Sequence, residues 1–339
     1  MCFNKGADFM SNYDPPFHIT EKMMNLVSEI SEQIGRINVL SHGTLNPHLR
    51  KENRIRTIHS SLAIEHNSLS LKQMTAILDG KRVLGDPNEI REVTNAFEAY
   101  EMMLSLNPLS IKDLLKAHET MMKGLIKENG VFRHGGVGVF DGEQLIHMAP
   151  PAKFVPDQIN DLLNWYSTSQ LQPLIRSAVF HYEFEFIHPF ADGNGRMGRM
   201  WHSLLLGQWK EIFYWLPIED LIRLRQAEYY DALGKADRDA DSAVFVELML
   251  EIILDTVKEI VVVGEDENNS GAINESVQKL LNVMGNESLP LIEIMRRLNL
   301  SHKPTFRKNY LLPALNLQLI EMTIPDKPNS RNQKYRKRT

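Results

Sequence analysis

Apolar residues recur at intervals of three and four through most of the chain, which is the pattern of amphipathic helices. The first such stretch begins after Thr20, a residue type that suits a helix N-cap. Its apolar face consists of Met23, Met24, Val27, Ile30, Ile34 and Ile37. The same pattern predicts further helices over residues 50–67, from Pro87, from Ser110 to Gly130, from Pro156, and over 174–187, 196–209 and 218–263. We therefore predict an all-α body.

One short segment breaks the helical pattern. Residues 137–140 and 143–147 flank Asp141-Gly142, a pair that suits a type I′ turn because both turn residues need positive φ. We predict a β-hairpin over residues 137–147, which Pro150-Pro151 ends. An isolated two-stranded hairpin is barely stable, so it must pack on the helices.

Polar and proline-rich stretches divide the chain into parts. Residues 1–16 are expected to be a flexible arm, and residues 264–271, which are polar and acidic between two glycines, a linker. Between them we predict an N-terminal helical region over 17–105 and a helical core over 106–263. Residues 272–339 then form a second domain.

The predicted second domain contains helices followed by two short strands. Leu291 to Leu298 is one helix, and Ser301 caps the next. Strands over 320–324 and 333–335 would flank a loop at 326–330. This order resembles a winged-helix domain, although Pro313 lies within the third helix.

Composition limits the classes of protein. Of 339 residues, 43% are hydrophobic and 24% charged, which excludes a disordered chain. No run approaches the roughly 18 to 20 apolar residues of a membrane span, and no secretory signal is visible. Cys2 is the only cysteine, which excludes an intramolecular disulfide and a cysteine-based zinc site. We therefore predict a cytoplasmic protein with no membrane partner.

Charge is distributed unevenly. The net charge is −5, yet residues 271–339 contain twelve Lys or Arg and five Asp or Glu, a net +7, which leaves −12 on residues 1–270. Such a basic module can bind nucleic acid through phosphate contacts. The candidate DNA-binding residues are Arg307, Lys308, Arg331, Lys334, Arg336, Lys337 and Arg338. A protein-docking module with a solvated basic tail explains the same pattern, and both interpretations stay open.

One segment, HPFADGNGRMGR, holds most of the chemistry. Within it Gly193 and Gly195 flank Asn194 just before an apolar helix. Glycines there let backbone N–H groups approach an anion, and the helix N-terminus favours negative charge. Arg196 and Arg199 are three residues apart, so both project from the first turn toward the same anion. The segment therefore predicts a phosphate-binding site.

Other side chains of this segment add chemistry. Asp192 places a carboxylate next to the phosphates, which suits Mg²⁺ because this ion takes few protein ligands and several phosphate oxygens and waters. His188 titrates near neutral pH and can accept a proton. Phe190 is expected to anchor the loop in the core.

This segment resembles the signature of the Fic proteins, His-x-Phe-x-(Asp/Glu)-Gly-Asn-Gly-(Arg/Lys)-x-x-Arg, and fills every fixed position. The resemblance covers roughly residues 45–260. It implies a mostly helical catalytic core with the hairpin as a flap, and transfer of AMP from ATP to a hydroxyl side chain of a target protein. The related Doc group, which transfers phosphate, has lysine where this chain has Gly195, so the resemblance favours AMP transfer.

The resemblance also implies a role for each matching residue. His188 would be the general base, and Asp192 would hold Mg²⁺ against the α- and β-phosphates of ATP. Arg196 would support the phosphates, and Arg199 would pair with the γ-phosphate. The anion hole would be formed by Gly193, Asn194 and Gly195. These parts suit phosphoryl-type transfer, which depends mostly on positioning and charge neutralisation.

Two flanking segments also resemble parts of Fic proteins. The hairpin over 137–147 would align the target segment by strand addition. Ser61 and Glu65 match the inhibitory motif (Ser/Thr)-x-x-x-Glu-(Gly/Asn) and, being four apart, lie on one helix face. Glu65 would then pair with Arg199 in place of the γ-phosphate, so that bound ATP is misaligned. His66 departs from the last position of the motif.

A later region resembles the part of Fic enzymes that contacts the adenosine of ATP. The resemblance implies this contact for Tyr229, Tyr230 and Asp237. Paired tyrosines are also common in helical cores, and that interpretation stays open. His181 is expected to be a core histidine.

The sequence therefore predicts a cytoplasmic, autoinhibited protein adenylyltransferase that uses ATP and Mg²⁺. Removal of AMP from a target, with Glu65 orienting a water, is an alternative activity. A DNA-binding regulator with a nucleotide-sensing core is another, which a mobility-shift assay with and without ATP would distinguish. The target protein, DNA and a second copy of the chain stay open as partners.

Overall fold

The computed structural model divides the chain into two compact units, Met1–Glu259 and Ile260–Thr339. The structure describes residues 13–40, 47–141, 144–271, 275–285, 287–300, 302–317, 319–325, 330 and 333–338. Most of the predicted N-terminal arm, residues 1–12, lies outside the described residues.

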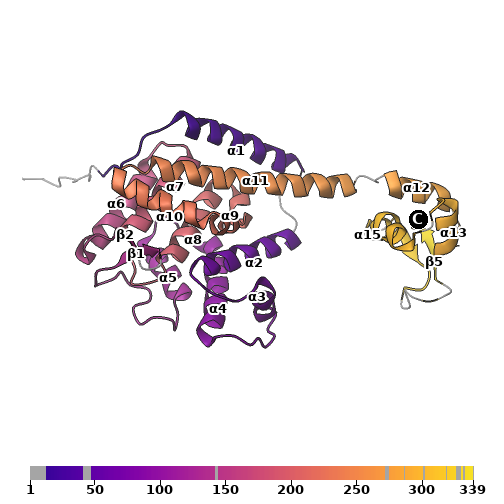
Figure 1. Ribbon diagram of the computed structural model, residues 1–339, viewed down its shortest axis with the longest axis horizontal. Helices are drawn as coiled ribbons and strands as arrows, with labels where there is room; N and C mark the ends of the chain where they lie inside the picture. The colour runs from indigo at the N-terminus through magenta and orange to yellow at the C-terminus, as the bar shows by residue number, and fades with distance from the viewer. Residues whose placement is uncertain are drawn as a thin grey trace, which may run out of the picture. The chain divides into compact units, whose positions relative to one another are not determined.

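The first unit is mostly helical, which confirms the predicted fold class (Figure 1). Its helices are α1 (Glu21–Leu40), α2 (Pro47–Ile64), α3 (Leu71–Leu78), α4 (Pro87–Met102), α5 (Ile111–Met121), α6 (Val155–Thr168), α7 (Pro173–Ile187), α8 (Asn194–Trp209), α9 (Ile218–Leu224), α10 (Gln226–Asp239) and the first part of α11 (Ala243–Gly271). No helix in the described part of the chain is long and apolar enough to cross a membrane.

Helix starts follow the capping signals. Thr20 Oγ1 accepts a hydrogen bond from the first turn of α1. Asp86 caps α4, in which Pro87 takes the first position and needs no hydrogen-bond acceptor. The sequence analysis missed α3, which begins with a reciprocal capping box between Ser70 and Gln73.

Two predicted helix lengths are wrong. α5 ends at Met121, not at Gly130, because the chain turns through Gly124, whose φ is +71°. The single helical stretch predicted over 218–263 is three helices. One of the breaks follows from Ala240, which takes a left-handed conformation (φ 49°) and ends α10.

α7 occupies the centre of the first unit. It is apolar on nearly every face, and most of its side chains are buried between α6 and α8. A helix that is apolar all round belongs in a core. α8 packs along it, with Trp201 fully buried. The loop that follows α7 therefore begins inside the unit, directly after the buried Ile187.

α1 lies along the first part of α11 (Figure 1). Lys22 Nζ is 2.6 Å from Glu251 Oε1 and 3.3 Å from Glu247 Oε2. Met23 is buried on the inner face of α1, whereas Met24, which was expected on that face, is 55% exposed. Adjacent helix residues point about 100° apart, and the side chain of Met24 falls on the outer side of α1.

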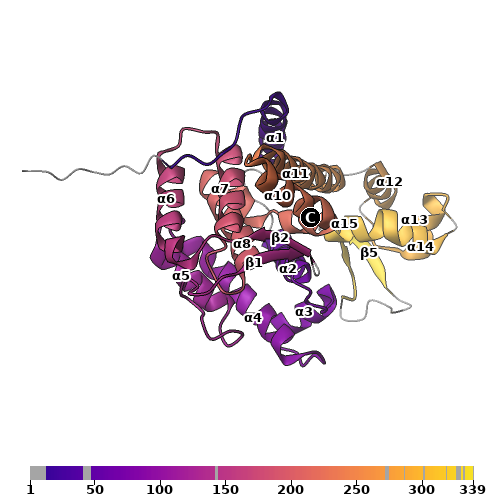
Figure 2. The ribbon, with the colours of Figure 1, turned by 60° about the vertical axis from the view of Figure 1, so that its left-hand side comes forward.

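The predicted hairpin is present as β1 (Gly138–Asp141) and β2 (Gln144–Met148), which pair antiparallel (Figure 2). A β-bulge lies between Val139 and Phe140, which bends the first strand. β2 packs against α10, so the hairpin is supported by the helices. The turn residues 142 and 143 lie outside the described residues.

The segment 264–271, which its composition predicted to be a linker, is helical. α11 continues to Gly271, and the division between the two units falls within this helix, after Glu259. Gly264 inside a helix costs only about 1 kcal/mol relative to alanine, and the segment contains no proline to stop the helix.

The second unit combines short helices with a small sheet. Its elements are α12 (Glu275–Met284), β3 (Leu289–Pro290), α13 (Leu291–Arg297), α14 (Lys303–Phe306), a π-helical turn (Arg307–Leu311), α15 (Leu312–Asn316), β4 (Ile320–Met322) and β5 (Lys334–Lys337). The strands pair antiparallel in the order β3-β5-β4. β3 was not predicted, because two residues are too few to show an alternating pattern. Phe306 and Tyr335 are part of the core of this unit.

Pro313 does not interrupt a regular helix. It stands in the first turn of α15, directly after the π-helical turn, a position where the missing N–H donor of proline is tolerated. Part of the positive charge of the unit is neutralised within it, since Arg296 pairs with Glu293 and Arg336 with Glu321. The winged-helix assignment and DNA binding stay predictions.

Candidate active site

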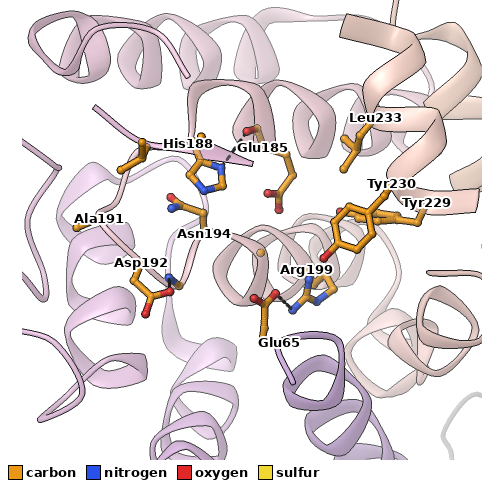
Figure 3. Close-up of a pocket in the computed structure, with 14 residues that line it drawn as sticks. Glu65, Glu185, His188, Ala191, Asp192, Asn194, Arg199, Tyr229, Tyr230 and Leu233 are labelled. Carbon is orange, nitrogen blue, oxygen red and sulfur yellow. Dashed lines mark hydrogen bonds and ion pairs between the residues drawn. The ribbon is translucent and has the colours of Figure 1, made fainter. Parts of the chain in front are cut away.

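His188 directly follows the last turn of α7 and reverses the chain. Its φ of 50° is left-handed, which is uncommon for a residue other than glycine, and its N–H bonds to Phe184 O at 3.0 Å. The side chain enters a pocket of about 240 Å³ (Figure 3). The pocket is lined by Glu65, Val137, Gly138, Glu185, His188, Ala191, Asp192, Gly193, Asn194, Gly195, Arg199, Tyr229, Tyr230 and Leu233.

One hydrogen bond fixes the tautomer of His188. Its Nδ1 lies 3.2 Å from Glu185 O. A carbonyl oxygen only accepts, so Nδ1 carries the proton and Nε2 is the basic nitrogen. Burial lowers the pKa of His188 below its ordinary value, which keeps the ring neutral at physiological pH. His188 is thus ready to accept a proton through Nε2.

The loop after His188 is held in place by contacts with His118. Phe190 is fully buried, as expected, and stacks on the ring of His118 at 3.7 Å between centroids. His118 Nδ1 accepts from Gly130 N, so its Nε2 carries a proton and donates to Asp192 O at 3.0 Å. Burial lowers the pKa of His118 to about 4, which keeps this imidazole neutral.

Asn194 closes the loop with its side chain. Its Oδ1 accepts from Phe190 N at 2.8 Å and its Nδ2 donates to Phe190 O at 2.9 Å. The amide is therefore used for structure, and the backbone of the next turn is left for an anion. α8 starts at this residue, and the first N–H groups of a helix have no partner within it.

Gly195 gives room to two opposing side chains. A Cβ built on it would lie 2.5 Å from Glu65 Oε1 and 2.9 Å from a terminal nitrogen of Arg199. Any larger residue would push the Glu65 carboxylate away from the start of α8. The glycine expected for anion binding therefore also permits the approach of Glu65.

Arg199 is held by the end of α2. Its guanidinium is buried and donates to Ser61 Oγ at 3.1 Å, to Ser61 O at 2.9 Å and to Glu65 Oε1 at 2.8 Å (Figure 3). Burial alone would raise the pKa of Glu65, but Arg199 and Arg196 lower it below its ordinary value. The ion pair is fully formed above the ordinary pKa of a glutamate and is lost only as the pH falls through the lowered value.

His66 preserves this geometry although it departs from the motif. Its φ is 69°, so the chain needs a left-handed residue directly after Glu65. Glycine and asparagine adopt this conformation readily, and histidine does so more often than most residues. Asn67 then accepts from Leu69 N and donates to Glu92 Oε2, which fixes the segment after the turn.

Arg196 lies beside the pocket and does not line it. It donates to Glu92 Oε1 at 3.1 Å and to Asp192 Oδ1 at 3.2 Å. The side chain of Asp192 is 54% exposed, and its Oδ1 also accepts from Gly193 N. Glu92 was not singled out in the sequence, because it lies 104 residues before Arg196 and meets it only in the folded chain.

The three residues predicted to contact adenosine do not all lie in the same pocket. Tyr229 and Tyr230 both line the pocket, and Tyr229 Oη lies 3.1 Å from His181 Nε2 in the buried core. His181 is a core histidine, as expected, since it is fully buried, and this burial lowers its pKa to about 3. Asp237 lies on another pocket of about 410 Å³, with Tyr13 and Glu183. It is two turns beyond Tyr230 on α10, so the structure does not bring it to His188.

Glu185 is a site residue that the sequence analysis missed. It is 5% exposed, and its Oε1 has no hydrogen-bond partner among the described residues. Burial raises its pKa, and its carboxyl fits only because Gly198 has no side chain. Its position three residues before His188 on α7 was the available signal, since residues at this spacing share a helix face.

No group of three or more His, Cys, Asp or Glu that could hold a metal occurs among the described residues. Of the three carboxylates that line the pocket, Glu65 is paired with Arg199 and Glu185 is buried, whereas Asp192 is exposed. One carboxylate is sufficient for Mg²⁺ when phosphate oxygens and waters complete its shell. The residues therefore fit Mg²⁺ that arrives with a nucleotide.

The chain matches two family models. Residues 108–206 match the Fic/DOC family, and residues 275–337 match the C-terminal domain of Fic-like proteins, described as filamentation induced by cAMP. A relative named protein adenylyltransferase fic-1, from Caenorhabditis elegans, is 29% identical over 238 residues, 65% of this chain and 43% of that protein. The chain thus spans less than half the length of this curated relative.

Solved structures agree with these matches. A crystal structure of a Fic family protein from Desulfovibrio desulfuricans is 52% identical, with a TM-score of 0.74 over 96% of this chain and 98% of that chain. A structure of fic-1 from Caenorhabditis elegans is 24% identical, with a TM-score of 0.59 over 72% of this chain and 74% of that chain, and shows the fold alone.

Proposed function

Because the chain belongs to the Fic family, we propose that it is a protein adenylyltransferase, which transfers AMP from ATP to a hydroxyl side chain of a target protein. The observation that carries this proposal is the pocket itself. It brings the basic nitrogen of His188, the anion-binding start of α8 and the guanidinium of Arg199 into one site. Gly195 favours AMP transfer over the phosphate transfer of the Doc group.

The proposed reaction uses these groups in sequence. His188 Nε2 takes the proton of the target hydroxyl, and its oxygen attacks the α-phosphorus of ATP. The bond from the α-phosphorus to the bridging oxygen breaks, and diphosphate leaves. The backbone of Gly193, Asn194 and Gly195 holds the phosphates, and Arg199 pairs with the γ-phosphate.

Asp192 is proposed to hold Mg²⁺, which would neutralise phosphate charge when bound. Arg196 reaches the phosphates only if it exchanges one of its present carboxylate partners, Glu92 or Asp192, for them. The mouth of the pocket includes Val137 and Gly138 at the start of the hairpin. A target segment that pairs with this strand edge would place its hydroxyl near His188.

Glu65 is proposed to inhibit this reaction. Its carboxylate holds the guanidinium that the γ-phosphate needs, so ATP binds without correct alignment of its α-phosphate. A second activity is favoured by the fact that Glu65 lines the same pocket as His188. There it could orient a water that removes AMP from a modified target.

Labelled ATP tests the proposed function. We expect the Glu65→Gly variant, with Mg²⁺ and ATP labelled at the α-phosphate, to label itself or proteins of a lysate, and ATP labelled at the γ-phosphate to give no protein label. Label from the γ-phosphate would instead show phosphate transfer. No label from either would contradict nucleotide transfer altogether.

We expect AMP transfer to keep its rate down to mildly acidic pH. The base must be deprotonated, and burial lowers the pKa of His188. The fall of the rate at acidic pH, the acid limb of the pH–rate profile, should therefore lie below the ordinary histidine pKa of about 6.5. Initial rates measured between about pH 5 and 8 check this. A limb above neutral pH would show that His188 is not the group that titrates.

A further inference from the structure

Arg133 is a buried cation outside the sequence motifs. It lies between α5 and β1 and is 3% exposed. In the part of the chain that the structure describes, no carboxylate lies within ion-pair distance of it. A buried charge needs compensation, so its partners must come from the backbone.

The guanidinium of Arg133 donates to four backbone carbonyls. Nε bonds to His188 O at 2.7 Å and one terminal nitrogen to Ile187 O at 3.2 Å. The others go to Gly135 O at 2.9 Å, just before the hairpin, and to Pro150 O at 2.5 Å, just after it. The backbone N of Arg133 also donates to Pro189 O at 2.9 Å.

These bonds explain how the charge is tolerated. Ile187 is the last residue of α7 and His188 its C-cap, where the carbonyls are unsatisfied and the helix dipole is negative. A cation at this end of α7 compensates both the unsatisfied carbonyls and the negative end of the helix dipole. Arginine suits the place better than lysine, because its planar guanidinium offers five fixed N–H donors and lysine a single rotating ammonium group.

We propose that Arg133 is a positioning residue that fixes the backbone of His188 and ties it to both ends of the hairpin. The inference rests on the proposed function, since it assigns the hairpin to the target and His188 to proton transfer. Through the side chain of Arg133, the position of His188 then depends on the position of the hairpin, which is proposed to align the target hydroxyl.

The charge of Arg133 has a second, separable effect. It opposes protonation of His188, while the carboxylates of Glu185 on the same helix and Glu65 at the end of α2 favour it. Removing the cation therefore raises the tendency of His188 to hold a proton. Geometry and charge are distinguished by two variants, Arg133→Lys, which keeps the charge, and Arg133→Met, which does not.

The experiment uses the full chain in the Glu65→Gly background and measures self-modification with ATP. We expect Arg133→Lys to lower the rate at saturating ATP about tenfold or more, because a shift of roughly 1 Å in a catalytic group can cost about 10²-fold. The acid limb of the pH–rate profile should stay at the same pH in Arg133→Lys, whereas it should move to higher pH in Arg133→Met. The affinity for ATP should change little in both.

The matched control is Arg176→Lys. Arg176 also donates to a backbone carbonyl, Ser169 O at 2.6 Å, and stacks on Tyr166, but it lies near the start of α7. Hydrogen exchange gives a readout that needs no activity. In Arg133→Lys, exchange should quicken both in the hairpin and in residues 187–193, and in Arg176→Lys in neither.

The outcomes separate the two proposals. A parent protein that transfers no AMP contradicts the proposed function, whatever Arg133 does to hydrogen exchange. A parent that transfers AMP, with a full rate and unchanged exchange in both Arg133 variants, overturns the positioning role. An equal loss of rate, ATP affinity and thermal stability in Arg133→Lys would also overturn it, since Arg133 would then only support the fold.

Discussion

Replacing His188 by alanine should lower AMP transfer about 10²–10⁴-fold, which is the usual contribution of a positioned general base. The reason lies in the geometry of its ring. Nδ1 donates a hydrogen bond to Glu185 O, so Nε2 is the one atom of this side chain that can accept the target proton. The described pocket also contains Glu65 and Glu185, but Glu65 is paired with Arg199.

ATP binding should survive the same substitution. The contacts proposed for the phosphates come from the start of α8 and from Arg199, and none involves the imidazole of His188. The rate of label transfer from α-labelled ATP and the dissociation constant of ATP, measured side by side, test both statements.

His134→Ala is the matched control. It is a histidine four residues before β1 and is exposed, with Glu128 as its partner at 3.7 Å. We expect no change in either measurement for this variant. A His188→Ala protein that keeps more than about a tenth of the rate would show that the base is another group.

Glu65→Gly should raise AMP transfer about 10- to 100-fold. The change removes a charge-assisted hydrogen bond of about 1.5–3 kcal/mol between Glu65 and Arg199, and each 1.4 kcal/mol corresponds to a tenfold change in population. Arg199 keeps its bonds to Ser61, so it stays in place and becomes available to the γ-phosphate. The measurement is the initial rate of transfer at equal ATP for wild type and variant.

His66→Gly is the control for a glycine at this turn. The residue has a φ of 69°, which glycine adopts without strain, and the Glu65 carboxylate is untouched. We expect this variant to keep the low rate of the wild type. If both variants are activated alike, the turn and not the carboxylate controls the site.

Glu65→Gly also tests the alternative activity. If Glu65 orients a water that removes AMP, the variant should lose release of AMP from a modified target while it gains transfer. Unchanged transfer in the variant would contradict the inhibitory role, since the ion pair with Arg199 would then not limit the reaction. The contact itself does not relax near neutral pH, because the pKa of Glu65 is lowered.

The sequence by itself determined the local features. Helices follow from the spacing of apolar residues and from caps such as Thr20 and Asp86, which act within one turn. The hairpin follows from the turn-forming pair Asp141-Gly142 between two short segments. The proposed phosphate-binding loop and the proposed base stand in twelve consecutive residues, so one segment was sufficient to identify the Fic family. Interactions of this range are visible in a linear order of residues.

Only the tertiary structure decided which distant residues meet at the site. Glu92 reaches Arg196, and Arg133 reaches His188, because α4 packs against α5, and both α5 and α7 pack against α8. Asp237, on the same helix as Tyr230, turns to another pocket. No periodicity records such contacts, since they depend on how whole helices pack, and an arginine bonded to carbonyls has no complementary charge in the sequence to reveal its partner.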